Sequence, residues 1–79
     1  MTAHEKTAAA IAAGCGGMQN IGSVSCCATR LRLRLKDLSL FNESIIGQIP
    51  EVKGILHRGD EIHVICGVNS IVYCRILQA

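Results

Sequence analysis

The clearest pattern along the chain is a strict alternation of cationic and apolar residues over positions 30–36. Leucine occupies positions 31, 33 and 35, and arginine or lysine occupies the positions between them. A period of two over seven residues predicts a half-buried β-strand, because successive side chains on a strand point to opposite faces. The leucines are therefore predicted to face the core and the cations to face water.

The region before this strand predicts a helix and a hairpin. Residues 2–14 are alanine-rich, which favours helix, and Thr2 and Glu5 have the spacing of a capping box. Gly14 is predicted to end this helix in the left-handed conformation. Residues 20–26 alternate loosely and predict a short strand, joined to the arginine-bearing strand by residues 27–29.

The region after the alternating strand predicts a short helix. Either Ser39 or Asn42 is expected to cap it, and Pro50 is expected to stop it.

A second hairpin and a last helix complete the prediction. Residues 52–57 and 61–65 flank a Gly-Asp pair, which is a common centre for a two-residue turn. Residues 68–78 have helical periodicity. The residues at helical spacing are Val68, Ile71, Val72, Arg75 and Ile76, and Tyr73 is expected to pack in the core.

The resulting order of elements is α-β-β-α-β-β-α. Hairpin connections within this order predict an α+β fold, with a four-stranded antiparallel sheet and three helices on one face. A length of 79 residues predicts a single domain over residues 1–79.

Composition and charge narrow the possible functions. With one Phe, one Tyr and no Trp, the core is predicted to be aliphatic, and the formal net charge is only +2. The basic excess is concentrated at positions 30–36, which suggests a local anion site more than a general nucleic-acid surface. The five cysteines are odd in number and no secretory signal is visible, so we expect reduced thiols in the cytoplasm. No apolar run approaches the roughly 20 residues that cross a bilayer.

Cys27 is the candidate nucleophile, because it lies just before the row of cations. Arg30 and Arg32, two residues apart on one strand face, would lower the pKa of a nearby thiol and offer planar donors to phosphate oxygens. The alternative interpretation of Cys27 is a buried small hydrophobe. That structural interpretation is kept for the other cysteines, Cys15, Cys26, Cys66 and Cys74. A solvated strand face is kept for Arg34 and Lys36.

Several segments together resemble the IIB domain of the glucose superfamily of bacterial sugar phosphotransferase systems. They are residues 16–21 (Gly-Gly-Met-Gln-Asn-Ile), 27–32 (Cys-Ala-Thr-Arg-Leu-Arg), 50–55 (Pro-Glu-Val-Lys-Gly-Ile), 59–67 and 72–73. The Cys-Ala-Thr-Arg-Leu-Arg run is the specific part of this resemblance. The sequence of this run is closer to that of the β-glucoside, sucrose, trehalose and N-acetylmuramate branch than to that of the glucose branch.

The resemblance implies that Cys27 is phosphorylated. In the family, this cysteine takes a phosphoryl group from a phosphohistidine of the IIA partner and passes it to a sugar held by the membrane-embedded IIC domain. Arg30 and Arg32 match the family's two arginines, which are needed for onward transfer. The backbone amides of Ala28, Thr29 and Arg30, with the Thr29 hydroxyl, are expected to bind phosphate.

The same resemblance implies a cytoplasmic domain, at the inner face of the cell membrane when joined to or docked on IIC. The scheme needs no metal or cofactor, and the IIA partner is expected to be acidic around its phosphohistidine. The chain departs from the family at three positions. Cys26 stands where polar residues are usual, and His63 and Cys66 replace what is often Gln and an aliphatic residue.

Two other classes of function compete with phosphoryl transfer. A nucleic-acid-binding module would use the basic strand, but that strand lacks stacking aromatics. A thiol redox or metal-binding protein would use the adjacent cysteines, but neither a CxxC nor an HxxxH pattern is present. The histidines His4, His57 and His63 are expected at the surface or half-buried.

Overall fold

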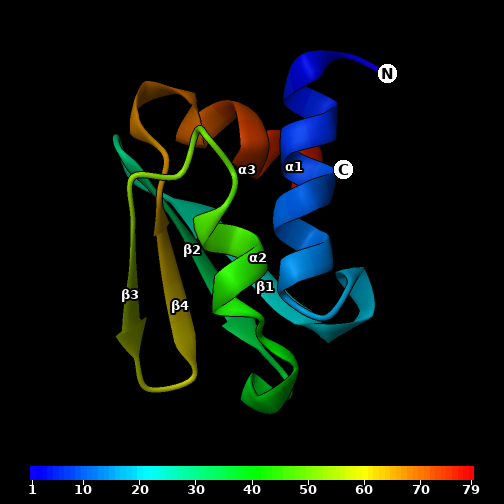
Figure 1. The fold of residues 1–79 in the computed structure, drawn as a ribbon, viewed down its shortest axis with the longest axis vertical. Coiled ribbons are helices and arrows are strands. Elements are labelled where there is room, and N and C mark those ends of the chain that lie inside the picture. Colours follow the sequence, from blue (N-terminus) through cyan, green and yellow to red (C-terminus); the bar gives the residue numbers. More distant parts are fainter.

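A computed structural model describes residues 1–79 and has the predicted α-β-β-α-β-β-α order (Figure 1). The helices are α1 (Ala3–Gly14), α2 (Glu43–Gly47) and α3 (Ser70–Gln78). The strands are β1 (Ile21–Cys26), β2 (Arg30–Leu35), β3 (Gly54–Arg58) and β4 (Glu61–Ile65). Short 3-10 turns lie at Met18–Asn20, Leu38–Leu40 and Gly67–Asn69.

The four strands form one antiparallel sheet in the order β1-β2-β4-β3. The alternating strand β2 is therefore an inner strand, paired with β1 on one side and with β4 on the other. Leu31 lies opposite Val64 and Leu33 lies opposite Ile62. These pairs share one face of the sheet, because side chains directly opposite each other in a ladder point to the same side. The arginines of β2 occupy the other face.

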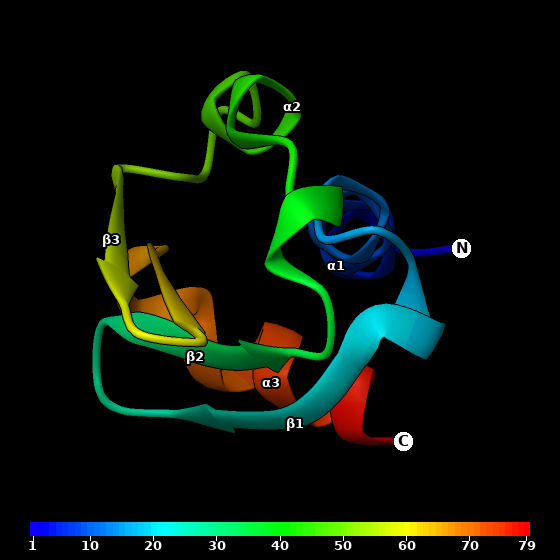
Figure 2. The same ribbon diagram turned by 90° about the horizontal axis from the view of Figure 1, so that it is seen from below.

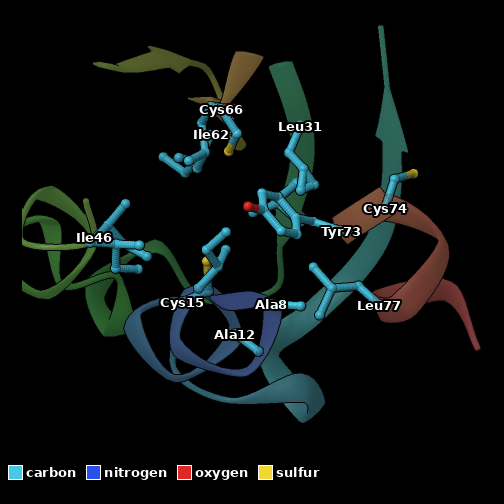
Figure 3. Packing of buried hydrophobic residues seen from close by; sticks show 14 of the residues in the cluster. Ala8, Ala12, Cys15, Leu31, Ile46, Ile62, Cys66, Tyr73, Cys74 and Leu77 are labelled. Atoms are coloured by element: carbon cyan, nitrogen blue, oxygen red, sulfur yellow. Dashed lines mark hydrogen bonds between the residues drawn. The ribbon is translucent and has the colours of Figure 1, made fainter. Parts of the chain in front are cut away.

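All three helices contribute to one core on the leucine face of the sheet. Figure 2 shows α1 and α2 on the same side of β2, and the close-up of the core shows side chains of α1, α2 and α3 converging around Leu31 (Figure 3). The core cluster includes Ile11 and Cys15 of α1, Ile46 of α2, and Tyr73 of α3. The predicted aliphatic core is confirmed, with Tyr73 as its one large ring.

The start of α1 is as predicted, but its end is not. Thr2 N donates to Glu5 Oε1 at 2.8 Å and Glu5 N donates to Thr2 Oγ1 at 3.1 Å, which completes the capping box. Gly14 is the last helical residue and is not left-handed, so that prediction was wrong; the positive φ angles are at Gly16 and Gly17 (93° and 94°). Gly14 is instead needed for packing, because a Cβ there would clash with the side chain of Ile46.

The predicted last helix is present but begins at Ser70, and the expected core packing of Tyr73 is confirmed. Val68 lies in the 3-10 turn before α3 and is 81% exposed, and Ile71 is 45% exposed. The side chains that face the core are those of Ser70, Tyr73, Cys74 and Leu77. The sequence carries two apolar stripes at helical spacing, and packing selects the stripe with the bulky tyrosine.

The middle of the chain resolves the choice between two caps. Asn42 caps α2 by accepting a hydrogen bond from Ile45 N at 3.1 Å. Ser39 instead donates its hydroxyl to Asp37 Oδ1 at 2.6 Å in the preceding turn. The second hairpin turns at Gly59 and Asp60 as predicted, and Gly59 has a φ of 63°.

Asn20 ties α1, β1 and β2 together at the end of the sheet. Its buried side chain donates to Cys15 O at 2.8 Å and to Asp37 O at 2.9 Å, and it accepts from Asp37 N at 2.9 Å. Its backbone oxygen also accepts from Lys36 N at 2.8 Å. One amide side chain thus satisfies three backbone groups of connecting segments.

Asn20→Ala is expected to lower the free energy of unfolding by about 1–3 kcal/mol, because it leaves buried backbone groups without partners. Urea denaturation followed by far-ultraviolet circular dichroism measures the change. The neighbouring substitution Gln19→Ala, at an exposed residue, is the matched control and should change stability by less than about 0.5 kcal/mol. Equal stability of the two variants would contradict the role assigned to Asn20.

Candidate functional site

Cys27 lies in the tight connection between β1 and β2, at the opposite end of these strands from Asn20. Its side chain is half-buried. The preceding residue, Cys26, ends β1, lies opposite Leu31 and packs against the core. The two adjacent thiols therefore occupy different surroundings, and only Cys27 lies outside the core cluster.

The loop that carries Cys27 is held by backbone hydrogen bonds at both of its sides. Cys27 N donates to Arg30 O at 3.0 Å, which closes the turn. Thr29 O accepts from both Cys66 N and Gly67 N, each at 3.0 Å, so the loop is tied to the end of β4. These bonds fix the backbone amides around the thiol before any ligand arrives.

The surroundings of Cys27 lower the pKa of its thiol. The backbone N–H of Thr29 is the largest cause, followed by the N–H of Arg30 and the guanidinium of Arg32, and these outweigh the opposing effect of desolvation. Donors and a positive charge favour the thiolate over the thiol. Cys27 is thus a partly accessible thiol in an electropositive setting, which is typical of reactive cysteines.

The buried cysteines have the opposite character. Burial raises the pKa of Cys15 to about 12 and that of Cys66 to about 11. Burial and then the neighbouring Cys26 thiol raise the pKa of Cys74 to about 11. The interpretation of these three residues as small hydrophobes is confirmed.

The predicted phosphate-binding groups differ in their contacts. The amides of Thr29 and Arg30 and the guanidinium of Arg32 lower the pKa of the Cys27 thiol. The Thr29 hydroxyl forms no hydrogen bond within the protein, and Thr29 is exposed. Arg30 Nη1 lies 3.3 Å from His63 Nδ1.

The two remaining cations of the row, Arg34 and Lys36, have other surroundings. Arg34 pairs with Asp60 Oδ2 at 3.0 Å and with Glu61 Oε2 at 3.1 Å, so its charge is largely compensated. Lys36 is exposed beyond the end of the strand. Arg32, by contrast, forms no ion pair and keeps its charge available next to Cys27.

The sequence analysis missed His63 as part of this site. His63 is only 8% exposed although it lies on the arginine face, opposite Arg32 in the ladder. Its Nε2 lies 2.7 Å from Glu61 Oε1. The alternation of residues 61–65 already placed Glu61 and His63 on one face; the missing information was that β4 pairs directly with β2.

The arrangement is suited to holding a small anion against a sulfur nucleophile. Fixed amides and an unpaired guanidinium can neutralise charge on phosphoryl oxygens while the thiolate approaches the phosphorus. No cluster of three or more His, Cys, Asp or Glu side chains is arranged to hold a metal ion. None of the helices has the length and apolar character that a membrane span requires.

Comparisons with known proteins point to the same chemistry. The family model described as "phosphotransferase system, EIIB" matches residues 9–42. The sucrose-specific EIIBC component of Klebsiella pneumoniae is 41% identical over 66 residues, which are 81% of this chain and 14% of that protein. The MurNAc-GlcNAc-specific EIIBC component of Staphylococcus aureus is 34% identical over 71 residues, 90% of this chain and again 14% of the relative.

A solved structure has the same fold. It is one domain of the phosphotransferase-system IIabc component from Clostridium difficile, with a TM-score of 0.82 and 28% identity. The match covers 95% of this chain and 78% of that one.

The fold and the matches are those of an EIIB domain of the phosphotransferase system. More narrowly, the chain belongs to the EIIB family of the glucose superfamily, alongside sucrose and MurNAc-GlcNAc EIIBC components. It spans about a seventh of the length of those relatives (14%).

The lowered pKa of Cys27 predicts a thiol that alkylates in less alkaline solution than an ordinary cysteine, whose pKa is about 8.5. As the pH rises through this lowered pKa, the thiolate forms and the rate with iodoacetamide increases. Arg32→Gln should move the midpoint of the rate profile upward, because it removes a charge that favours the thiolate. Mass spectrometry of the peptide containing Cys27, in a Cys26→Ser background, measures the rate.

Arg34→Gln is the matched control for this experiment. Because Arg34 is paired with Asp60 and Glu61, its loss should leave the midpoint unchanged. A midpoint that responds equally to both substitutions would contradict the local role of Arg32.

Proposed function

We propose that Cys27 is the phosphoryl carrier of this EIIB domain, and that residues 1–79 act as one IIB unit. The observation that carries the proposal is a half-exposed thiol whose pKa is lowered by fixed amides and by the unpaired Arg32. The family supplies the chemistry, which is phosphoryl transfer in sugar uptake.

The proposed reaction has two steps, and each exchanges one bond to phosphorus for another. In the first, the Cys27 thiolate attacks the phosphorus of a phosphohistidine on IIA; the S–P bond forms, the N–P bond breaks, and the imidazole leaves with the electron pair. In the second, a sugar hydroxyl attacks the phosphocysteine; the O–P bond forms and the thiolate leaves. The hydroxyl proton goes to a base at the sugar site or to water.

Cys27 needs little further activation in this scheme. A thiolate requires no general base, and the charge on the equatorial oxygens is met by the amides of Thr29 and Arg30 and by Arg32. Arg30 and the Thr29 hydroxyl lie next to these groups and are proposed to bind the phosphoryl oxygens once Cys27 is loaded. The same donors would serve both steps, because each step passes through a similar planar phosphoryl group.

The proposed partners are a IIA protein or domain and a IIC membrane permease domain. The relatives named above are EIIBC components, which supports IIC as the partner that presents the sugar. The relatives are named for sucrose and for MurNAc-GlcNAc, so we propose an acceptor sugar of this glycoside branch. The domain would then work at the cytoplasmic face of the membrane, joined to or docked on IIC.

The proposed docking face surrounds the Cys27 loop. Val68 and Ile71 are exposed apolar residues on the segment that Cys66 and Gly67 tie to Thr29. Apolar contacts beside an exposed Arg32 fit a small, transient interface with an acidic rim on the partner.

Phosphorylation should add about 80 Da, one phosphoryl group, to this chain. Intact-mass spectrometry after incubation with phosphoenolpyruvate, the general phosphotransferase proteins and IIA measures the gain. Wild type and Cys26→Ser should show it, and Cys27→Ser should not, because only Cys27 combines accessibility with a lowered pKa. Absence of the gain in wild type, or its persistence in Cys27→Ser, would refute the proposal.

Val68→Glu should raise the KM for phosphorylated IIA about tenfold while leaving kcat near the wild-type value. The substitution puts a negative charge on the docking face without touching the donors around Cys27. Ile45→Glu, at an exposed apolar position on α2, is the matched control and should leave both constants unchanged. A loss confined to kcat would argue against a docking role for Val68.

A further inference from the structure

We propose that His63 is a positioning residue for Arg30: in its neutral form it fixes the Arg30 guanidinium beside the Cys27 loop, and it releases this group when it gains a proton. The inference rests on the proposed function of Cys27, because Arg30 matters only if a phosphoryl group arrives there. It is carried by the hydrogen bonds and the burial of His63.

The partners of the His63 ring determine where its proton lies. Arg30 Nη1, 3.3 Å from Nδ1, can only donate, so Nδ1 must offer its lone pair. Glu61 Oε1, 2.7 Å from Nε2, is an acceptor, so Nε2 carries the hydrogen. The hydrogen bond from His63 is also the largest cause that lowers the pKa of Glu61. A neutral imidazole with one proton, on Nε2, satisfies both partners.

The position of Glu61 is itself fixed. Its second oxygen, Oε2, accepts from Arg34 Nη2 at 3.1 Å, while Arg34 Nη1 bonds to Asp60 at 3.0 Å. Arg34, Glu61, His63 and Arg30 therefore form a continuous chain of hydrogen bonds across β2 and β4. The orientation of the imidazole is set at one end of this chain, and the guanidinium of Arg30 is held at the other.

The burial of His63 strengthens its contact with Arg30. The side chain of His63 is only 10% exposed, so water cannot easily replace Arg30 as a partner. A protonated imidazole would carry hydrogen on both nitrogens and would present an N–H to a guanidinium that cannot accept it. The two cations would then repel each other at short range. Arg30 would lose its fixed position.

The residues that face His63 come from its own strand and from the two strands paired with it. On β2 these are Arg30 and Arg32, with Arg34 acting through Glu61. On β4 the facing charge is Glu61 itself, and on β3 the residue directly opposite His63 is the uncharged Leu56. Beyond Leu56, Arg58 lies opposite Glu61. The one facing carboxylate, that of Glu61, is shared with Arg34.

The first test is the pH profile of phosphoryl transfer from 32P-labelled IIA to this chain. Relative to a His63→Gln variant, wild type should lose rate on acidification. Gln retains a donor and an acceptor but does not titrate, so its rate at neutral pH should stay within about threefold of wild type. His63→Leu should be about tenfold slower at every pH, as expected for one lost charge-assisted hydrogen bond.

Two controls separate positioning from folding and from partner effects. His57→Gln removes the other histidine that pairs with a glutamate, His57 with Glu43 at 2.8 Å, and it should keep the wild-type profile. Circular dichroism checks that His63→Leu is folded, and His63→Gln tests the proposal without creating an unpartnered Arg30. The same acid loss in wild type and His63→Gln would overturn the proposal.

The second test needs no partner protein, so it separates this inference from the proposed function. Nitrogen-15 NMR of the unphosphorylated chain should show the Nε2–H tautomer of His63. The Arg30 guanidinium signals should broaden as His63 titrates, while the Arg32 signals should not. Arg30 signals that are indifferent to this titration, or an Nδ1–H tautomer, would overturn the proposal. Failure of wild type to be phosphorylated would count against Cys27 as carrier and leave this result standing.

Discussion

The pairing of β2 with strands on both of its edges is the constraint on which the rest of the structure depends. Because β2 is bonded to β1 and β4, its pleat cannot rotate, and its leucines and arginines are committed to opposite faces. Burial of Leu31, Leu33 and Leu35 beneath three helices therefore also fixes the direction of the arginines. The packing of the core and the orientation of the arginines are therefore both determined by this one strand.

Equal spacing along β2 does not give its arginines equal surroundings. Arg34 is compensated by two carboxylates at the hairpin turn, Arg30 is bonded to a buried imidazole, and Arg32 has no anionic partner. The graded compensation concentrates unneutralised charge near the loop that carries Cys27. A formal net charge of only +2 therefore coexists with a strongly electropositive corner.

The sequence predicted features that depend on local periodicity and turn chemistry. These include the leucine face of β2, the capping box at Thr2 and the turn at Gly59. It could not give the strand order, because neighbours in a sheet are chosen by long-range packing. The contact between Arg30 and His63 depends on that order and was missed for this reason. The helical period of residues 68–78 does not by itself show which side of α3 faces the core, because two stripes fit that period and the tertiary fit of Tyr73 distinguishes them.

The different surroundings of Cys26 and Cys27 have a consequence for how the protein responds to oxidation. Neighbouring Cα atoms are about 3.8 Å apart, which is shorter than the roughly 4.4–6.8 Å spanned by ordinary disulfides. Cys26 is also drawn inward by its contacts with the core beside Cys74, so its sulfur is not free to swing toward Cys27. Cys26 and Cys27 are therefore poorly placed to form a disulfide with each other, and closing one would require the end of β1 to open first.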